Sequence, residues 1–197
     1  MTKRLFDWLA SGMGLLLLAP LLVVLAVWIK LDSPGPVFFR QERVGLAGKL
    51  FRIHKFRTMV TDAERLGLQI TVGADARVTR VGHWLRKYKL DELPQLLDVW
   101  LGHMSLVGPR PEVPRYVSCY PADVRDVVLS VRPGITDRAS IEFKDENEIL
   151  GRAADPSEAY IHEILPIKLG YYLEYVRNQS LLGDVRLIFR TLGALFR

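Results

Sequence analysis

The sequence predicts a mainly α-helical fold with a short β-hairpin, preceded by an apolar N-terminal helix that a proline interrupts. Three observations lead to this prediction. Residues 8–29 form a run of 22 residues without a charged side chain. An apolar run, 37–39, and a run that alternates apolar and basic residues, 50–56, flank the loop 45–48, which contains two glycines. Elsewhere, apolar residues recur mainly at the three- and four-residue spacing of amphipathic helices.

The composition indicates a folded domain with a basic surface. The chain has 197 residues, 49% of them hydrophobic, and a formal net charge of +5, which suits one domain with a core together with a membrane segment. The basic balance implies an anionic partner: nucleic acid, an anionic lipid surface or phosphorylated substrates. Aromatic residues do not interleave with the basic ones as a stacking surface would require, which counts against nucleic acid. The single Cys119 excludes an internal disulfide, and four scattered histidines argue against a zinc site.

The N-terminal apolar run has two interpretations. As a straight helix it would extend about 33 Å, enough to cross the hydrocarbon core of a bilayer. Pro20, near its middle, removes a helical hydrogen bond, and basic residues flank both ends of the run. One interpretation is a transmembrane helix kinked at the proline. In the other, the helix breaks at Ala19 and Pro20, enters one leaflet and returns, so that both basic ends stay on the cytoplasmic side. The residues alone leave both open.

The predicted hairpin carries a cluster of basic side chains. Arg52 and His54 lie on its polar face, and Lys55 and Arg57 flank Phe56 at its end. Arg43 is a further candidate for that face. Such a cluster is either a solvated basic face or a cradle for phosphate groups.

The next segments lead toward a pair of acids. A capping box predicts a short helix over residues 61–67, and a loop should follow over 68–76. Thr79 is a suitable N-cap for another helix, whose buried side would carry Val81, Leu85 and Tyr88. Arg86 projects from a different face of that helix, five residues before Asp91, and is placed to reach anything bound beside that carboxylate.

Asp91 and Glu92 stand at the predicted start of a helix. Asp91 occupies the position expected of an N-cap, and Pro94 is tolerated because first-turn amides have no intrahelical acceptor. A carboxylate there stays ionised near the positive end of the helix dipole, as a nucleophile or metal ligand must. An ordinary helix start has the same pattern. The spacing of the apolar residues predicts a buried face made of Leu93, Leu96, Leu97, Trp100 and Leu101.

The remaining segments read mainly as helices joined by a rigid connection. Pro109 and Pro111 hold Arg110 in an extended conformation, either as a simple connection or to direct the guanidinium. Residues 113–130 should be helical with a break near Pro121, and Asp155-Pro156 begins a helix, kinked at Pro166, that runs to about Asn178. The last segment, 181–197, is a basic amphipathic helix that either packs on the core or lies among lipid headgroups.

Taken in order, five stretches cover nearly the whole chain and resemble the bacterial sugar transferase family, the monotopic phosphoglycosyl transferases. They are the Pro-broken N-terminal helix, Lys55-Phe56-Arg57-Thr58-Met59, Leu90-Asp91-Glu92-Leu93-Pro94-Gln95, Met104-Ser105-Leu106-Val107-Gly108-Pro109-Arg110-Pro111, and Val131-Arg132-Pro133-Gly134-Ile135-Thr136.

The resemblance implies an architecture and a location. Residues 1–32 would form a re-entrant membrane helix broken at Ala19 and Pro20, in the bacterial inner (cytoplasmic) membrane. Residues 33–180 would form a compact α/β catalytic domain on the cytoplasmic face, and 181–197 an interfacial amphipathic helix of the same domain. The length matches the small members that carry only the catalytic unit. Membrane lipids would be partners, and a homodimer is left open.

The resemblance also implies a reaction. A UDP-sugar would give its phosphosugar to polyprenol (undecaprenyl) phosphate, with UMP as the other product. Asp91 would attack the β-phosphorus to form a covalent intermediate, and Mg²⁺ would be held by Asp91 and Glu92. Glu92 would hold the metal or assist the second step. The side chains expected to bind substrate phosphate are Arg86, Arg110, Lys55, Arg57 and Arg132.

Three departures from the family pattern restrict what carries over from relatives, and two other functions remain open. Asp137-Arg138 follows the Arg-Pro-Gly-Ile-Thr run where many relatives have Gly and then Trp-Gln, so specificity does not carry over from them. His103 stands where an Asp is common before Met-Ser, and Tyr172 stands where many have Asp, so the roles of those acids do not carry over. The alternatives are a glycosyltransferase that moves the sugar alone and releases UDP, and a non-catalytic, membrane-anchored basic scaffold.

Overall fold

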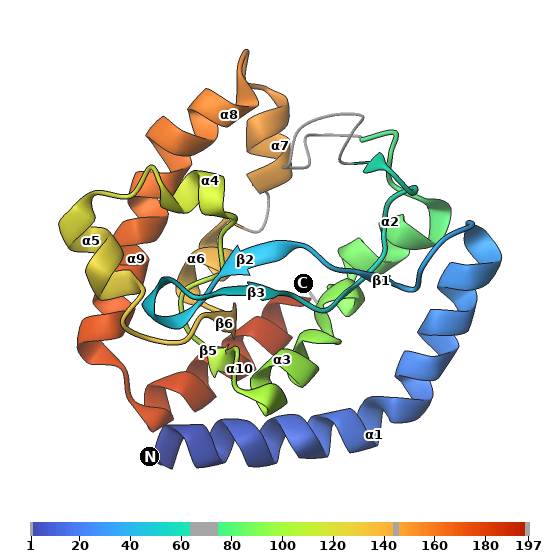
Figure 1. Ribbon diagram of the computed structural model, residues 1–197, viewed down its shortest axis with the longest axis horizontal. Helices are drawn as coiled ribbons and strands as arrows, with labels where there is room; N and C mark the ends of the chain where they lie inside the picture. The colour runs from blue at the N-terminus through green and yellow to red at the C-terminus, as the bar shows by residue number, and fades with distance from the viewer. Residues whose placement is uncertain (1, 64–74, 144–145, 196–197) are drawn as a thin grey trace.

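The computed structural model describes residues 2–63, 75–143 and 146–195. The described chain is mainly helical, and its strands form three two-stranded sheets (Figure 1). This confirms the predicted mainly α-helical fold with a short hairpin. The predicted helix over 61–67 and loop over 68–76 fall mostly outside the described residues.

Helix α1 (Thr2–Asp32) is the longest element and is apolar and long enough to cross a membrane, by length and composition. The helix continues without interruption through Ala19 and Pro20, where the break was predicted. Figure 1 nevertheless shows α1 bending: it runs along the lower edge of the molecule and then turns upward. Most of its apolar side chains are exposed, including Met13, Leu16, Leu17, Leu31, Val23 and Val24.

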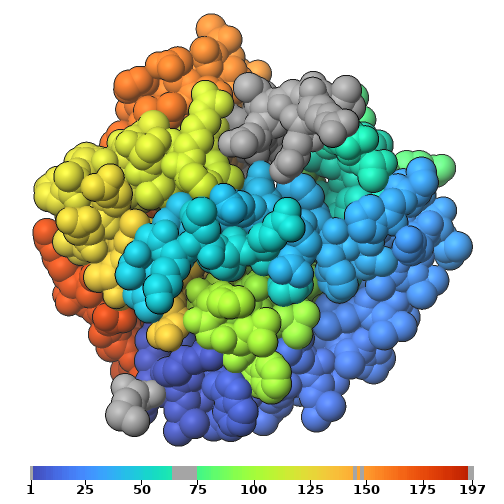
Figure 2. Space-filling view, in the orientation of Figure 1, coloured from blue at the N-terminus to red at the C-terminus, as the bar shows by residue number. Residues whose placement is uncertain are grey.

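The predicted hairpin is present, with its turn at the predicted place. Strand β1 (Phe38–Phe39) pairs antiparallel with β4 (Lys55–Phe56), and β2 (Glu42–Val44) pairs antiparallel with β3 (Leu50–Arg52). A 3₁₀ turn, η1 (Leu46–Gly48), joins β2 to β3. In the space-filling view the hairpin lies across the front of the molecule, with α1 along the lower and right edges (Figure 2).

Helix α2 (Arg80–Lys87) begins as the sequence predicts. The Thr79 hydroxyl accepts a hydrogen bond from the Gly82 amide at 3.0 Å and so caps the helix. The 3₁₀ turn η3 (Leu90–Glu92) and helix α3 (Gln95–Leu101) follow.

The predicted buried face of α3 is wrong. The buried residues of this helix are Gln95, Asp98 and Val99, whereas Trp100 and Leu101 are 43% and 54% exposed. The apolar stripe is instead turned toward α1, where Trp100 stacks on Trp8 with ring centroids 6.4 Å apart. Polar Asp98 can face inward because its carboxylate accepts hydrogen bonds from the backbone and ring of His54, each at 2.8 Å.

A parallel strand pair lies behind the hairpin. Strand β5 (Ser105–Val107) pairs with β6 (Gly134–Thr136). Between them, α4 (Pro114–Val117) and α5 (Ala122–Val128) lie on either side of Pro121, which confirms the predicted break there.

The C-terminal third is helical, with Asp155 as the predicted cap: its side chain accepts from the amides of Ser157 and Glu158. The helical run ends at Asn178 as expected, but a π-helical turn stands before Pro166. The successive elements of the C-terminal third are α6 (Arg138–Glu142), α7 (Glu146–Gly151), α8 (Pro156–Ala159), η4 (Tyr160–Ile164, the π-helical turn), α9 (Leu165–Asn178) and α10 (Leu181–Leu195).

Helix α10 packs on the core, one of the two arrangements left open by its sequence. It contacts β5, β6 and α6, with Asp184 fully buried. Leu182 and Phe189 are 73% and 69% exposed on its other side. The helix therefore packs on the core and also presents apolar side chains outward.

The close approach of β5 and β6 depends on two glycines. A Cβ added at Gly134 would overlap backbone atoms of Gly108, so neither strand can move aside cheaply. We expect Gly134→Ala to lower the free energy of unfolding by about 3 kcal/mol, because overpacking against backbone costs that much. Gly170→Ala is the matched control: a Cβ there meets nothing within 4 Å, and alanine should stabilise α9 by up to about 1 kcal/mol. Thermal unfolding in detergent would measure both; equal melting temperatures would refute the packing argument.

Candidate active site

The acidic pair, Asp91 and Glu92, lies in the turn η3 and is almost completely buried, at 2% and 9% exposed. The predicted N-cap role of Asp91 is wrong. Pro94 occupies the N-cap position of α3, and the Asp91 side chain pairs instead with Lys55. Lys89, in the left-handed conformation with φ 54°, precedes the turn. The turn directs both carboxylates toward the end of the hairpin rather than toward the helix amides.

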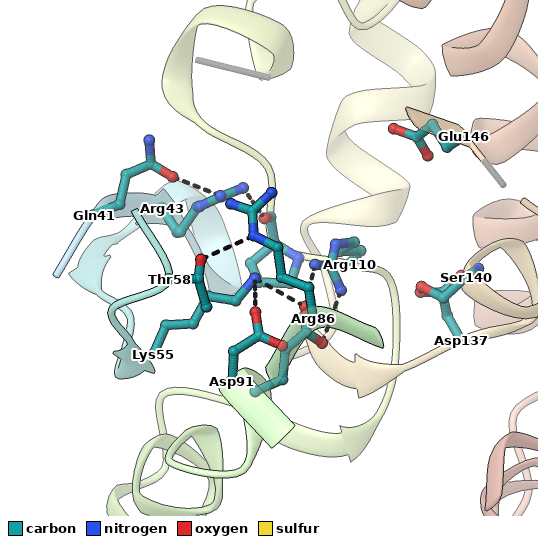
Figure 3. A network of polar contacts seen from close by, with 12 residues as sticks. Gln41, Arg43, Lys55, Thr58, Arg86, Asp91, Arg110, Asp137, Ser140 and Glu146 are labelled. Carbon is teal, nitrogen blue, oxygen red and sulfur yellow. Dashed lines mark hydrogen bonds and ion pairs between the residues drawn. The ribbon is translucent and has the colours of Figure 1, made fainter. Parts of the chain in front are cut away.

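Two cations from distant parts of the chain converge on the acidic pair (Figure 3). Lys55 Nζ lies 2.9 Å from Asp91 Oδ2 and 3.2 Å from Glu92 Oε1, and thus bridges the two carboxylates. Arg110 forms a second pair with Glu92, with Nη2 2.6 Å from Oε1 and Nη1 3.3 Å from Oε2. Both proline-flanked Arg110 and hairpin residue Lys55 are therefore aimed at the predicted site.

The charge balance of this group favours ionised Glu92. Burial alone would raise the pKa of the Glu92 carboxyl, but Arg110 and Lys55 outweigh burial and hold that pKa well below its usual range. In turn, the Glu92 carboxylate raises the pKa of Arg110 well above its ordinary value.

Arg86 joins the same group through the hairpin. Its Nε donates to the Thr58 hydroxyl at 2.9 Å. Burial lowers the pKa of Arg86, and the nearby Asp91 carboxylate is the strongest interaction acting in the opposite direction. Lys55, Arg86 and Arg110, three of the five predicted phosphate-binding residues, thus surround the acidic pair.

The other two predicted phosphate-binding residues are not brought to this group. The Arg57 guanidinium is 5% exposed and bonds the turn after α1, through Ser33 and the carbonyls of Pro34 and Pro36. Arg132 Nε donates to the Gly102 carbonyl at the end of α3. In this structure both side chains hold loops.

Sequence reasoning gave no role at the acidic pair to three residues that the structure places at or beside the site, although it named Arg43 as a possible member of the basic face of the hairpin. Thr58 accepts from Arg86, and Lys89 precedes the acidic turn. Arg43 donates to the Pro111 carbonyl at 2.8 Å and to Gln41 Oε1 at 2.6 Å, next to Arg110 (Figure 3). Thr58 had a signal in the sequence, since it follows directly after the basic run 55–57.

The donor set at the acidic pair suits a magnesium ion shared with a substrate. Asp91 Oδ1 is buried and has no hydrogen-bond partner among the described residues. Nowhere in residues 2–63, 75–143 and 146–195 do three or more His, Cys, Asp or Glu side chains gather as a complete metal cage. Mg²⁺ commonly takes one or two carboxylates and completes its shell with substrate phosphates and water. Two adjacent carboxylates fit that pattern.

A second set of buried polar side chains lies apart from the acidic pair. Glu112 accepts from the Tyr160 hydroxyl at 2.5 Å, and Lys168 contacts the same hydroxyl at 3.4 Å. The departure residue Asp137 is also buried, with its carboxylate bonded to Ser140, and Figure 3 places it away from Asp91. Burial raises the pKa of Asp137. The departure at Asp137 therefore lies in the structure around the site and does not involve the acidic pair itself.

The chain is similar to several characterised proteins. It is 41% identical over 192 residues to the UDP-N-acetylgalactosamine-undecaprenyl-phosphate N-acetylgalactosaminephosphotransferase of Aeromonas hydrophila, covering 96% of this chain and 42% of that protein. It is 38% identical over 193 residues to the UDP-glucose:undecaprenyl-phosphate glucose-1-phosphate transferase of Escherichia coli K12, covering 96% and 39%. This chain thus spans about two-fifths of the length of those two relatives.

A shorter relative matches over most of its own length. The exopolysaccharide production protein PSS of Rhizobium leguminosarum bv. phaseoli is 39% identical over 203 residues, covering 96% of this chain and 92% of that protein. The family described as bacterial sugar transferase matches all of residues 1–197. The ordered motifs, the acidic pair and these matches agree, and the chain belongs to the bacterial sugar transferase family.

Proposed function

We propose that this protein transfers a phosphosugar from a UDP-sugar to polyprenol (undecaprenyl) phosphate and releases UMP. The observation that carries the proposal is the state of Asp91. Lys55 holds one of its oxygens, while the other is buried with no partner among the described residues, at the centre of a group of cations. The names of the Aeromonas and Escherichia relatives, which specify undecaprenyl phosphate as acceptor, support the same reaction class.

The reaction takes place in two displacements at one phosphorus. Asp91 attacks the β-phosphorus of the UDP-sugar, the bond from that phosphorus to the bridging oxygen breaks, and UMP leaves with the electron pair. An oxygen of the lipid phosphate then attacks the same phosphorus, displaces the Asp91 carboxylate and forms a lipid diphosphate sugar. Lys55, Arg86 and Arg110 offset the negative charge of the phosphates in both steps.

The two acids have different surroundings, and this supports different roles. Both oxygens of Glu92 are engaged by Arg110 and one also by Lys55, so Glu92 is the poorer nucleophile. Asp91 keeps an oxygen available for attack. Mg²⁺, held by Asp91 and Glu92, would supply charge neutralisation on the diphosphate.

The attachment of α1 supports a re-entrant arrangement in the cytoplasmic membrane. Near its start, Arg4 donates to the Val99 and Trp100 carbonyls at the end of α3. At its other end, Asp32 accepts from the Val81 amide of α2. Both ends therefore bind the same polar body, while the apolar middle is exposed. A helix that enters and leaves on one face meets both conditions, and it keeps the site at headgroup level, where a lipid phosphate and a water-soluble UDP-sugar can meet.

The nucleotide released distinguishes this proposal from the alternatives. The purified protein would be incubated with a panel of UDP-sugars, polyprenol phosphate and Mg²⁺, and the nucleotide product identified by chromatography. We expect UMP with at least one sugar, and no turnover after removal of Mg²⁺ by a chelator. UDP as product would indicate transfer of the sugar alone. No turnover with any UDP-sugar would favour the non-catalytic scaffold.

Replacement of the nucleophile should abolish covalent labelling. With a UDP-sugar carrying a radioactive β-phosphate and no lipid acceptor, the wild-type protein should retain label after denaturation. Asp91→Asn should retain none, because the amide is not a nucleophile at phosphorus. Asp126→Asn, an exposed carboxylate on α5, is the matched control and should label like the wild type. Label that persists in Asp91→Asn would exclude Asp91 as the nucleophile.

Cysteine accessibility tests the re-entrant arrangement. In a Cys119→Ser background, which removes the exposed native thiol, Thr2→Cys lies at the first residue of α1 and Glu42→Cys lies after its end. An impermeant maleimide should modify both from the cytoplasmic side of oriented vesicles, because neither end of α1 crosses the bilayer. Modification of the two cysteines from opposite sides would establish a simple transmembrane span.

A further inference from the structure

Side chains of the membrane helix hold three consecutive residues of strand β5. The Asp7 carboxylate accepts from the Ser105 hydroxyl at 2.8 Å and from the Leu106 amide at 3.2 Å. Lys3 Nζ donates to the Val107 carbonyl at 3.1 Å. Strand β5 has β6 on one edge only, so α1 supplies polar partners that a neighbouring strand would otherwise provide.

The Asp7–Ser105 hydrogen bond is buried, so its removal has consequences. Asp7 is 2% exposed although it lies in the second turn of the long apolar helix α1. A buried carboxylate is tolerated only when hydrogen bonds satisfy it. Lys3 is shared with Asp184 of α10, which is 1% exposed, and Tyr175 of α9 donates to the same Val107 carbonyl at 2.9 Å. Two helices, α1 and α9, therefore bond the Val107 carbonyl, and Asp184 of α10 holds Lys3.

The chain leads directly from this anchored strand to the site. The Gly108 amide donates to the Thr136 carbonyl at 3.1 Å, and the Gly134 amide donates to the Pro109 carbonyl at 2.9 Å. The next residue is Arg110, which reaches Glu92. Prolines flank Arg110, and the Gly108 amide and the Pro109 carbonyl before it are both hydrogen-bonded. The backbone between β5 and Arg110 therefore has little conformational freedom. A shift of β5 becomes a shift of Arg110.

The same end of α1 also binds the element that follows Glu92. Arg4 bonds the last carbonyls of α3, and α3 begins three residues after Glu92. Lys3, Arg4 and Asp7, which we call the α1 brace, thus contact β5, which precedes Arg110 in the chain, and α3, which follows Glu92. We propose that Asp7 and Lys3 are positioning residues for Arg110, so that the membrane helix forms part of the frame of the active site as well as its anchor. This inference rests on the proposed function.

The two partners of the Asp7–Ser105 hydrogen bond can be removed separately. In reconstituted vesicles, Asp7→Asn should lower kcat/KM about 10- to 100-fold, the range expected when a catalytic group is misplaced by about 1 Å. Most of the loss should appear as a raised KM for the UDP-sugar, as for Arg110→Lys made as a reference. Ser105→Ala removes the partner on β5 with a milder change and should give a smaller effect in the same direction. The double variant should lose less than the two single losses combined, because both act on one contact.

Two controls separate positioning from a general loosening of the helix. Asp32→Asn changes a carboxylate at the other end of α1 that bonds α2 instead of β5, and its KM should match the wild type. Asp126→Asn, exposed on α5, should match it in all respects. Membrane sedimentation and thermal unfolding should be similar for Asp7→Asn and Asp32→Asn.

The possible failures are distinct. An equal rise in KM for Asp32→Asn, fully additive losses, or an unchanged KM in both Asp7→Asn and Ser105→Ala would overturn the positioning role. If the wild-type protein released no UMP from any UDP-sugar, the proposed function itself would fail.

Discussion

The bridge that Lys55 makes between Asp91 and Glu92 is the interaction on which the rest of the site depends. Two adjacent carboxylates buried to this extent lose their hydration and repel each other. Cations beside them are needed to offset both costs. Lys55 comes from the hairpin and Arg110 from the segment after β5, so the buried acidic pair has its cationic partners only when both of those elements are in place. The hairpin, the parallel strand pair and the acidic turn are thus linked through charge as well as through packing.

This balance also has a bearing on substrate entry. Under the proposed function, the cations that stabilise the acidic pair are those that a diphosphate would attract, so substrate binding would exchange one set of anionic partners for another. Arg86 and Arg110 do not depend on the acids alone for their orientation, since Thr58 holds Arg86 and two prolines hold Arg110. A site arranged in this way loses little order when phosphate oxygens approach, which is the condition for electrostatic preorganisation.

Much of the fold could be predicted from local sequence. The cap at Thr79, the turn of the hairpin, the break at Pro121 and the helix start at Asp155 each depend on a few neighbouring residues, and the structure confirms them. Sequence analysis also selected the acidic pair and Arg110 as candidate site residues, because ordered motifs mark them. The orientation of α3 could not be predicted, because its apolar side faces another helix that is itself mostly exposed. Apolar periodicity identifies a face that avoids water without saying whether protein or lipid covers it.

The remaining errors come from contacts between distant segments. Asp91 has the sequence signature of a helix cap, but a lysine 36 residues earlier in the chain competes for its carboxylate and a 3₁₀ turn replaces the first helical turn. Arg57 looks like a phosphate ligand because basic residues surround it, yet it holds the turn that follows α1. In both cases the sequence shows the charge of the side chain, and only the three-dimensional structure shows which partner it meets.

The α1 brace has a consequence for the exchange of parts between related proteins. If the membrane helix were only an anchor, another hydrophobic segment could replace it without affecting the catalytic part. Here the helix supplies partners for the Leu106 amide and for the carbonyls at the end of α3, and a substitute would leave these groups without them. The anchor and the catalytic part should therefore be inherited together, and a chimera with a foreign membrane helix would need matching polar residues in its first two turns.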